Sequence, residues 1–172
     1  YMGDCIMAFW NAPLDDPEHA VNSCRAALAM RAALEKLNAT LRKEAEKAKQ
    51  KLHEIHIGIG LNTGPACVGN MGSDQRFDYS VIGDTVNLAS RLEGQSKTYG
   101  VDIVIGPGTF EKAKDFATLE LDLIRVKGKN LPVRIHALMG NGALAGSHAF
   151  GTLAAKHAEM MAAYRGQDWE KA

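Results

Sequence analysis

Apolar positions that recur every three or four residues predict one long helix near the start of the chain. They are Val21, Cys24, Ala27, Met30, Leu34, Leu37 and Leu41. Residues at this spacing share one helical face, so the stripe predicts a helix that packs on a core. The preceding Asp15-Asp16-Pro17-Glu18 is typical of a helix start, with acidic residues and a proline in the first turn. Residues 42–51 are charged on every side, which predicts a solvated helix end that leads into a loop.

Short apolar runs between turn signals predict the strands. Residues 5–10 form such a run before Asn11-Ala12-Pro13, which is consistent with a buried strand. The other predicted elements are strands at 56–61, 76–82 and 101–105, helices at 84–96 and 107–117, and a closing hairpin at 119–126 and 133–139. Strands mixed with helices, without strict alternation, favour an α+β fold with a largely antiparallel sheet.

Glycines gather in one stretch of the chain, because residues 58–72 hold five of the 17 glycines. Glycine at this density indicates tight turns or a close approach between backbones.

The last part of the chain has its own pattern. Residues 141–147 are mostly small and predict a flexible linker between a domain at 1–140 and a helical segment at 148–172. In that segment, Phe150, Leu153, His157, Met160 and Tyr164 return to helical spacing. The pattern fits a lone amphipathic helix and equally the start of a tetratricopeptide-type repeat, because one partial unit cannot separate the two.

Composition narrows the classes of function. The chain has 172 residues, with 20 basic and 20 acidic side chains, so it lacks the general charge that would indicate a nucleic-acid or membrane-surface partner. Any anion site must therefore be local. The three cysteines show no metal-ligand spacing and are expected to be small buried hydrophobes in a reducing compartment. No apolar run reaches about 18 residues, so we expect a cytoplasmic segment, with an upstream regulatory or membrane domain still open.

The run from Tyr79 to Glu93 carries the candidate chemistry. It predicts a strand that turns through Gly83 into a helix capped by Asp84. Asn87 and Arg91 lie four residues apart, so their side chains share one face of that helix. An amide that positions a sugar beside a guanidinium that binds phosphate suits nucleoside triphosphate chemistry. The spacing by itself also fits an ordinary amphipathic helix with a polar outer face.

This run closely resembles the signature of class III nucleotidyl cyclases, which close a nucleoside triphosphate into its 3',5'-cyclic monophosphate. Four further blocks match in the family's order: Tyr1–Asp4 with Ile6–Trp10, Gly58–Gly64, Val68–Gly72 and Val126–Lys129. The resemblance implies a ferredoxin-like cyclase fold, in which a mostly antiparallel sheet is flanked by helices.

The resemblance also implies roles for single residues. Asn87 matches the asparagine that orients the ribose, and Arg91 the arginine that stabilises the transition state. Lys127 matches the lysine that binds the terminal phosphates, although Lys129 could take that role. Asp4 matches the second of two aspartates that bind two divalent ions, Mg²⁺ or Mn²⁺. The family's first aspartate lies upstream of Tyr1, so we expect this chain to begin after it.

Ser80 matches the position that contacts the base. Serine or threonine there is similar to a bacterial-type subclass that commonly uses ATP, so the resemblance implies an adenylyl cyclase. Guanylyl cyclase and a non-catalytic nucleotide-binding or dimerisation module remain as alternatives. Because family sites lie at a two-fold interface, a chain that carries both Asp4 and Asn87 is expected to act as a homodimer, with ATP or GTP as its small-molecule partner.

Overall fold

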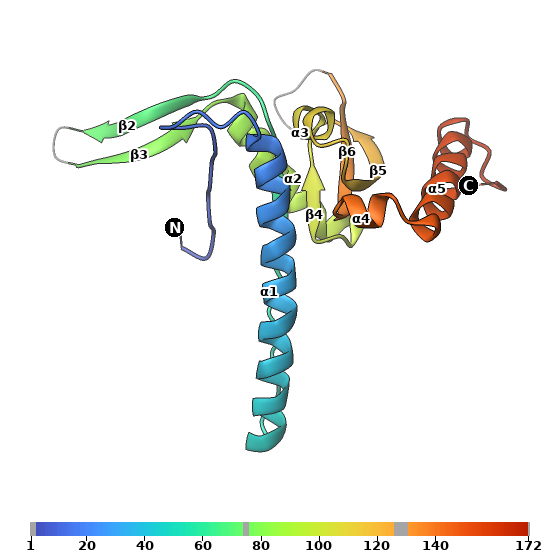
Figure 1. Ribbon diagram of the computed structural model, residues 1–172, viewed down its shortest axis with the longest axis horizontal. Coiled ribbons are helices and arrows are strands. Elements are labelled where there is room, and N and C mark those ends of the chain that lie inside the picture. The colour runs from blue at the N-terminus through green and yellow to red at the C-terminus, as the bar shows by residue number, and fades with distance from the viewer. Residues whose placement is uncertain (1–2, 74–75, 126–130, 172) are drawn as a thin grey trace.

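The computed structural model describes residues 3–73, 76–125 and 131–171. Its elements, in chain order, are α1 (His19–Ala48), β1 (Ile59–Leu61), β2 (Cys67–Ser73), β3 (Arg76–Ile82), α2 (Asp84–Tyr99), β4 (Ile103–Ile105), α3 (Pro107–Lys112), β5 (Ala117–Ile124), β6 (Val133–Gly140), α4 (Gly142–Ala145) and α5 (His148–Arg165) (Figure 1). The sequence predicted the type of most of these elements, but not β2 or α4, and several bounds differ.

The strands form a mixed sheet and a separate hairpin. The sheet has the order β1-β4-β6-β5, in which β1 and β4 are parallel and the other two pairs are antiparallel. The β2–β3 hairpin forms a two-stranded antiparallel sheet of its own. The predicted α+β class is confirmed, and the predicted closing hairpin is the β5–β6 pair.

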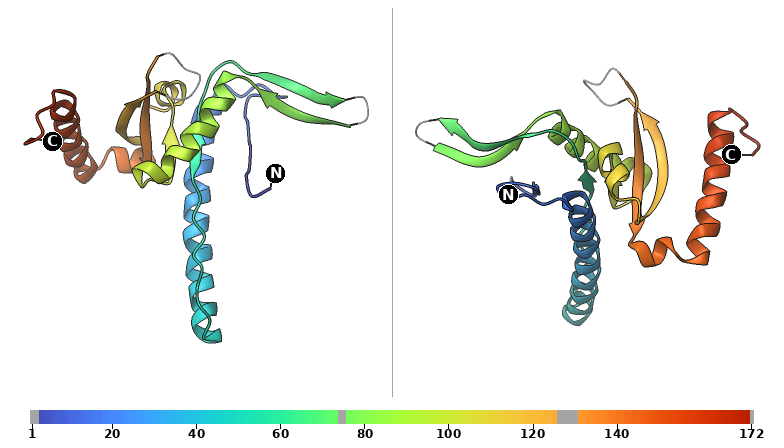
Figure 2. Two further views of the ribbon diagram at one scale, coloured as in Figure 1. Left: turned by 180° about the vertical axis from the view of Figure 1, so that it is seen from behind. Right: turned by 45° about the horizontal axis from the view of Figure 1, so that its top comes forward.

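Three parts project from the central sheet. The lower half of α1 extends away from the body as a stalk, with the chain after it running back alongside (Figure 1). The β2–β3 hairpin reaches out to one side, and α5 lies on the opposite side, as both views of Figure 2 agree. The sheet, α2 and α3 therefore form the compact centre of the molecule.

The core has two layers, one on each face of the sheet. Successive residues of a strand point to opposite faces, and β4 is buried on both. Ile103 and Ile105 pack in a cluster with Cys24 and Ala27 of α1. Val104 packs in a second cluster with Leu88 and Leu92 of α2. The sheet thus lies between α1 and α2, and α2 is held by an apolar ridge on its inner face.

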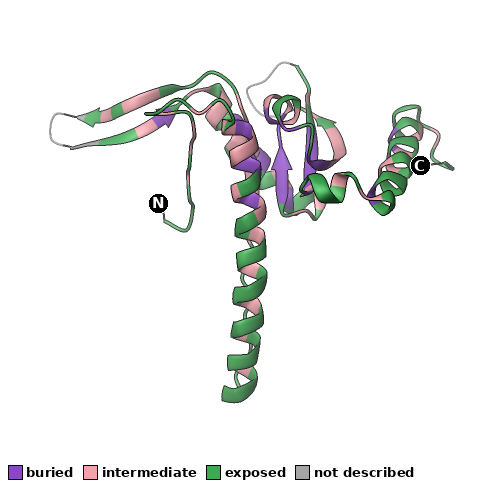
Figure 3. Ribbon diagram, viewed as in Figure 1, coloured by how far each residue is buried: buried purple, intermediate pink, exposed green. Residues whose placement is uncertain are grey.

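The apolar stripe of α1 is buried over only part of its length. Its buried residues end at Ala27, while Met30 and Leu37 are 41% and 47% exposed. Figure 3 shows that most of the stalk is exposed. The helix itself was predicted correctly, but beyond Ala27 its expected core face is at most half-buried.

The prediction of a buried strand at residues 5–10 is wrong. Within this run, Cys5 alone forms an isolated backbone β-bridge, and Ile6 is 58% exposed. A strand requires a neighbouring strand to take its backbone hydrogen bonds. Phe9 contacts Tyr79 of β3, but no ladder pairs this run with a described strand. The expectation of three buried cysteines is also wrong, because Cys5 and Cys67 are exposed. Cys24 alone is buried, and burial raises the pKa of its thiol to about 11.

One histidine belongs to the core. His136 of β6 is 5% exposed, and its ring stacks on Phe110 with the ring centroids 3.8 Å apart. Among the described residues, its Nδ1 atom has no hydrogen-bond partner. Burial, with a smaller contribution from the positive charge of Arg134, lowers the pKa of His136 from 6.5 to about 4. The imidazole is therefore neutral in the folded protein at pH 7.

We expect the folded protein to lose stability as the pH falls, because the buried His136 side chain must take up a proton. The folded pKa of His136 is lower than the unfolded value, so the unfolded chain binds the proton first. The stabilisation that comes from keeping His136 neutral is complete above about pH 6.5. It is lost as the pH falls to about 4, by up to about 3 kcal/mol. His136→Phe keeps the stack on Phe110 and cannot titrate. Urea unfolding at pH 7 and pH 4.5 should show a smaller loss for the variant, and identical losses would contradict this assignment.

The C-terminal helix α5 is attached to β5 through one acidic residue. The carboxylate of Glu120 pairs with Arg134 and with Arg165 of α5, and its carbonyl oxygen lies 2.5 Å from Nε2 of His157. Phe150 and Met161 are the buried residues of α5. The short helix α4 occupies part of the predicted linker 141–147. The division into a domain at 1–140, a linker and a segment at 148–172, like the possible repeat, stays a prediction.

Each helix among the described residues is either too short or too polar to cross a membrane.

Candidate functional site

The candidate site is centred on the turn from β3 into α2. Gly83 has a φ of 149°, a conformation that favours glycine and turns the strand sharply into the helix. The helix begins at Asp84, so Gly83 occupies the cap position. The prediction that Asp84 is the cap is therefore wrong by one residue. The carboxylate lies in the first turn instead, where the helix dipole favours negative charge.

Asn87 and Arg91 lie on the part of α2 that turns away from the core. The inner ridge of the helix is buried at Leu88, Leu92 and Ser96, whereas Asn87 is exposed and Arg91 is half-buried. Within the described part of the chain, neither side chain makes a hydrogen bond or an ion pair. An amide and a guanidinium are thus held one turn apart with their hydrogen-bonding groups available to a ligand.

The backbone of β1 lies directly against α2. A Cβ atom on Gly60 would come within 2.1 Å of the carbonyl oxygen of Ala89 and 2.3 Å of the backbone nitrogen of Glu93. On Gly58 it would come within 2.2 Å of Oγ of Ser96. Sequence reasoning left these glycines without a role at the site. Their alternation in the sequence was the available signal, because residues two apart in a strand share one face.

Ser80 lies on the β2–β3 hairpin. It is half-buried and is paired with Gly69 across the hairpin. The neighbouring Tyr79 is 48% exposed, and its ring centroid lies 5.9 Å from that of Phe9. Ser80 and the pair on α2 therefore come from consecutive elements that are joined by Gly83.

The structure shows less about the remaining predicted site residues, Asp4, Lys127 and Lys129. Asp4 is exposed in a turn at the start of the chain. In the described ranges, no group of three or more histidine, cysteine, aspartate or glutamate side chains could hold a metal ion. Lys127 and Lys129 lie outside the described residues.

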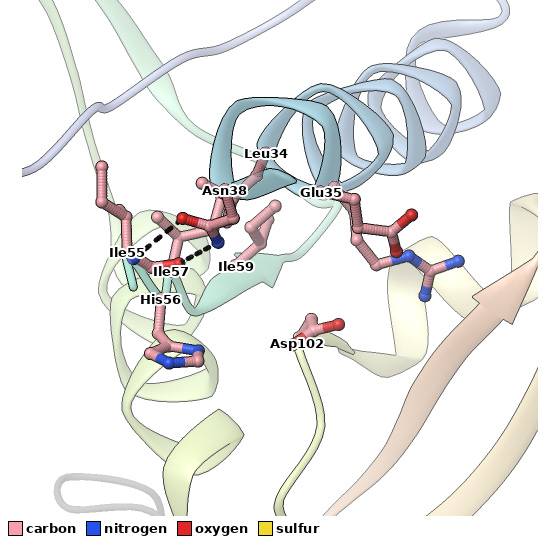
Figure 4. A pocket seen from close by; sticks show the side chains of 9 residues that line it. Leu34, Glu35, Asn38, Ile55, His56, Ile57, Ile59 and Asp102 are labelled. Carbon is pink, nitrogen blue, oxygen red and sulfur yellow. Dashed lines mark hydrogen bonds between the residues drawn. The ribbon is translucent and has the colours of Figure 1, made fainter. Parts of the chain in front are cut away.

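Two hollows lie away from these residues, at the base of the stalk. The first has a volume of about 120 Å³ and lies between α1, the segment 55–59 and Asp102 (Figure 4). There the Asn38 amide donates to the Ile55 carbonyl oxygen at 2.8 Å and accepts from the Ile55 N–H at 3.0 Å. The second hollow, of about 190 Å³, shares His56 and Asp102 with the first. Neither is lined by a predicted site residue.

A family model described as the adenylate and guanylate cyclase catalytic domain matches residues 1–140. Over 141 residues, the chain is 36% identical to adenylate cyclase 1 of Rhizobium meliloti (strain 1021). That match covers 81% of this chain but only 20% of the relative. The chain therefore spans about a fifth of the length of this curated relative.

Two solved structures share the fold. The adenylyl cyclase CyaB from P. aeruginosa is 31% identical with a TM-score of 0.64, over 77% of this chain and 65% of that one. The guanylyl cyclase Cya2 is also 31% identical, with a TM-score of 0.61, over 76% of this chain and 63% of that one. The similarity to solved structures thus includes both substrate classes.

Proposed function

This chain belongs to the family of adenylate and guanylate cyclase catalytic domains, and on that premise we propose that it converts ATP to 3',5'-cyclic AMP and pyrophosphate. The observation that carries the proposal is the pair on α2. Asn87 and Arg91 lie one turn apart on the outer side of a helix that the sheet holds firmly, and neither has a partner within the described residues.

The reaction makes one bond and breaks one. The ribose 3'-oxygen attacks the α-phosphorus as the hydroxyl loses its proton, and the bond from the α-phosphorus to the oxygen that bridges to the β-phosphate breaks. Negative charge grows on the phosphoryl oxygens and on the leaving pyrophosphate. The Arg91 guanidinium can donate two parallel hydrogen bonds to these oxygens. The Asn87 amide can hold the ribose so that the 3'-oxygen faces the phosphorus.

Asp4 is the residue of this chain that would hold a metal ion. Its exposed carboxylate is the kind of oxygen donor that Mg²⁺ and Mn²⁺ prefer, and Mg²⁺ commonly binds through one or two carboxylates together with substrate phosphates. Two such ions would neutralise charge on the phosphates when bound. Because the described residues contain no cluster of acidic side chains, Asp4 fits as one ligand of a shared site.

The base and the terminal phosphates of the nucleotide would be bound by other residues. Ser80 would contact the base, since its hydroxyl can donate to adenine N1 or accept from the adenine amino group. Lys127, or Lys129 in its place, would bind the terminal phosphates as a point charge. These contacts set affinity for the nucleotide, whereas Asn87 and Arg91 act on the reacting centre.

A homodimer is the form of the protein that we propose to be active. The β2–β3 hairpin stands apart from the four-stranded sheet (Figure 1), and an isolated two-stranded hairpin is at best marginally stable in water. Its Tyr79 and Ile82 are 48% and 57% exposed. A second copy would cover these side chains and could place its Asp4 opposite Asn87 and Arg91.

Guanylyl cyclase is the second candidate, because Cya2 matches as closely in sequence identity as CyaB does. The Ser80 hydroxyl does not by itself exclude guanine. The curated relative with 36% identity is an adenylate cyclase, which supports ATP as the first choice.

The direct test is product formation by the full-length protein, including whatever residues precede Tyr1. ATP and GTP are supplied separately with Mn²⁺ or Mg²⁺, at protein concentrations at which sedimentation shows a dimer. We expect cyclic AMP from ATP and much less cyclic GMP. Faster turnover of GTP would reverse the substrate assignment. If a demonstrated dimer forms neither cyclic AMP nor cyclic GMP, that result would support the non-catalytic alternative.

A further inference from the structure

The turn that follows β1 joins the starts of two helices. Asn62, Thr63 and Gly64 make up this turn and form a clasp between the two helices. On one side, Nδ2 of Asn62 donates a hydrogen bond to the backbone carbonyl oxygen of Thr85 at 3.1 Å. Thr85 is the second residue of α2, so the clasp is tied to the first turn of the helix that carries Asn87.

The other side of the clasp is tied to α3. Oγ1 of Thr63 lies 2.9 Å from Oγ1 of Thr109, which is fully buried. A Cβ atom on Gly108 would come within 2.0 Å of the Thr63 carbonyl oxygen, and one on Gly106 within 2.4 Å of Oδ1 of Asn62. The backbone of α3 therefore lies directly against the Thr63 backbone, and the Asn62 side chain lies against Gly106, so the clasp has little room to move.

Thr85 is held from a second direction as well. A Cβ atom on Gly64 would come within 2.8 Å of its Oγ1 atom, so the Thr85 side chain packs directly on the clasp. The clasp restrains the first turn of α2, while Gly58 and Gly60 restrain its middle. Asn87 closes that first turn, and Arg91 lies one turn later, between Ala89 and Glu93, which Gly60 contacts.

We propose that Asn62 is a positioning residue for the cyclase reaction, acting through Thr85 on Asn87 and Arg91. This inference rests on the proposed function. Asn62 touches no reacting atom in it; it fixes the start of α2 so that the amide and the guanidinium meet the transition state. A displacement of about 1 Å at a reacting centre can cost about a hundredfold in rate. Nucleotide affinity depends mainly on residues of other elements, so kcat should fall far more than KM rises.

The test compares Asn62→Ala with Asn38→Ala in the full-length protein, with ATP and Mn²⁺. Asn38 is a matched control, because its amide also bonds to a backbone segment, at the stalk and away from the site. For Asn62→Ala we expect kcat to fall about tenfold or more, with KM changed less than about threefold. For Asn38→Ala we expect both within about twofold. Equal kcat values in the two variants would overturn the proposal.

Asn62→Asp separates the hydrogen bond from packing. The aspartate has the same shape, but when ionised it cannot donate to the Thr85 carbonyl oxygen. The ordinary pKa of aspartate, about 3.9, leaves it ionised at pH 7, so kcat should fall about as far as in Asn62→Ala although the packing is kept. A kcat close to the wild-type value in Asn62→Asp would show that Asn62 only fills space.

A second measurement does not depend on the reaction. Hydrogen exchange of the backbone amides of residues 87–91 should be about tenfold faster in Asn62→Ala than in Asn38→Ala, because the first turn of α2 opens more often. If the wild-type protein forms no cyclic nucleotide, the proposed function fails. The exchange rates then still decide the role of Asn62, and equal rates in both variants would reject it.

Discussion

Replacing Arg91 by alanine is expected to lower kcat for cyclic nucleotide formation by about a hundredfold or more, which corresponds to about 3 kcal/mol of transition-state stabilisation. The guanidinium donates to oxygens on which charge develops, and alanine leaves that charge unmatched. Stability should change by less than about 1 kcal/mol, because Arg91 is half-buried and has no partner within the described residues. Steady-state kinetics and thermal unfolding on the same preparation measure the two effects.

Two further variants make the Arg91 experiment specific. Lys97→Ala removes a cation from the exposed last turn of the same helix and should leave kcat within about twofold. Arg91→Lys keeps the charge but loses the planar fork, so it should recover only part of the activity. A loss of activity in Lys97→Ala as large as in Arg91→Ala would indicate that α2 responds to its total charge, and the assigned role of Arg91 would fail.

Gly60→Ala should destabilise the folded protein by about 3 kcal/mol, the upper end of what overpacking usually costs, and should abolish activity. The added methyl group would lie 2.1 Å from the Ala89 carbonyl oxygen and 2.3 Å from the Glu93 nitrogen. Both are backbone atoms of α2 that cannot rotate away, so β1 and α2 must separate. The displacement would carry Asn87 and Arg91 with the helix. Urea unfolding measures the loss of stability.

Gly94→Ala is the matched control for this substitution. Gly94 lies in the interior of α2, and an added Cβ there meets no atom within 4 Å. Alanine restricts the unfolded chain more than glycine does, so this variant should be more stable by about 0.5–1 kcal/mol. If both variants were equally stable, the contact between β1 and α2 would not be as close as the structure shows.

The local sequence pattern was enough to predict the strand, turn and helix of the candidate site, whereas the resemblance to the cyclase signature singled out Asn87 and Arg91. The strand, the turn at Gly83 and the helix follow one another within fifteen residues, so their geometry depends on nearby hydrogen bonds and on the freedom of one glycine. For the same reason the sequence predicted that Asn87 and Arg91 share one helical face. The collinear blocks predicted the family, and the match over residues 1–140 confirms it. The roles of the single residues remain predictions.

Packing between distant segments was decided only by the tertiary structure. The apolar stripe of α1 continues to Leu41 in the sequence, but its fully buried residues end at Ala27, and periodicity cannot show where close packing ends. Residues 5–10 have the apolar composition of a buried strand but no described strand to pair with. The clasp joins Asn62 to Thr85, 23 residues away. A sequence determines which face a helix can bury, but the elements that meet that face are chosen by contacts far apart along the chain.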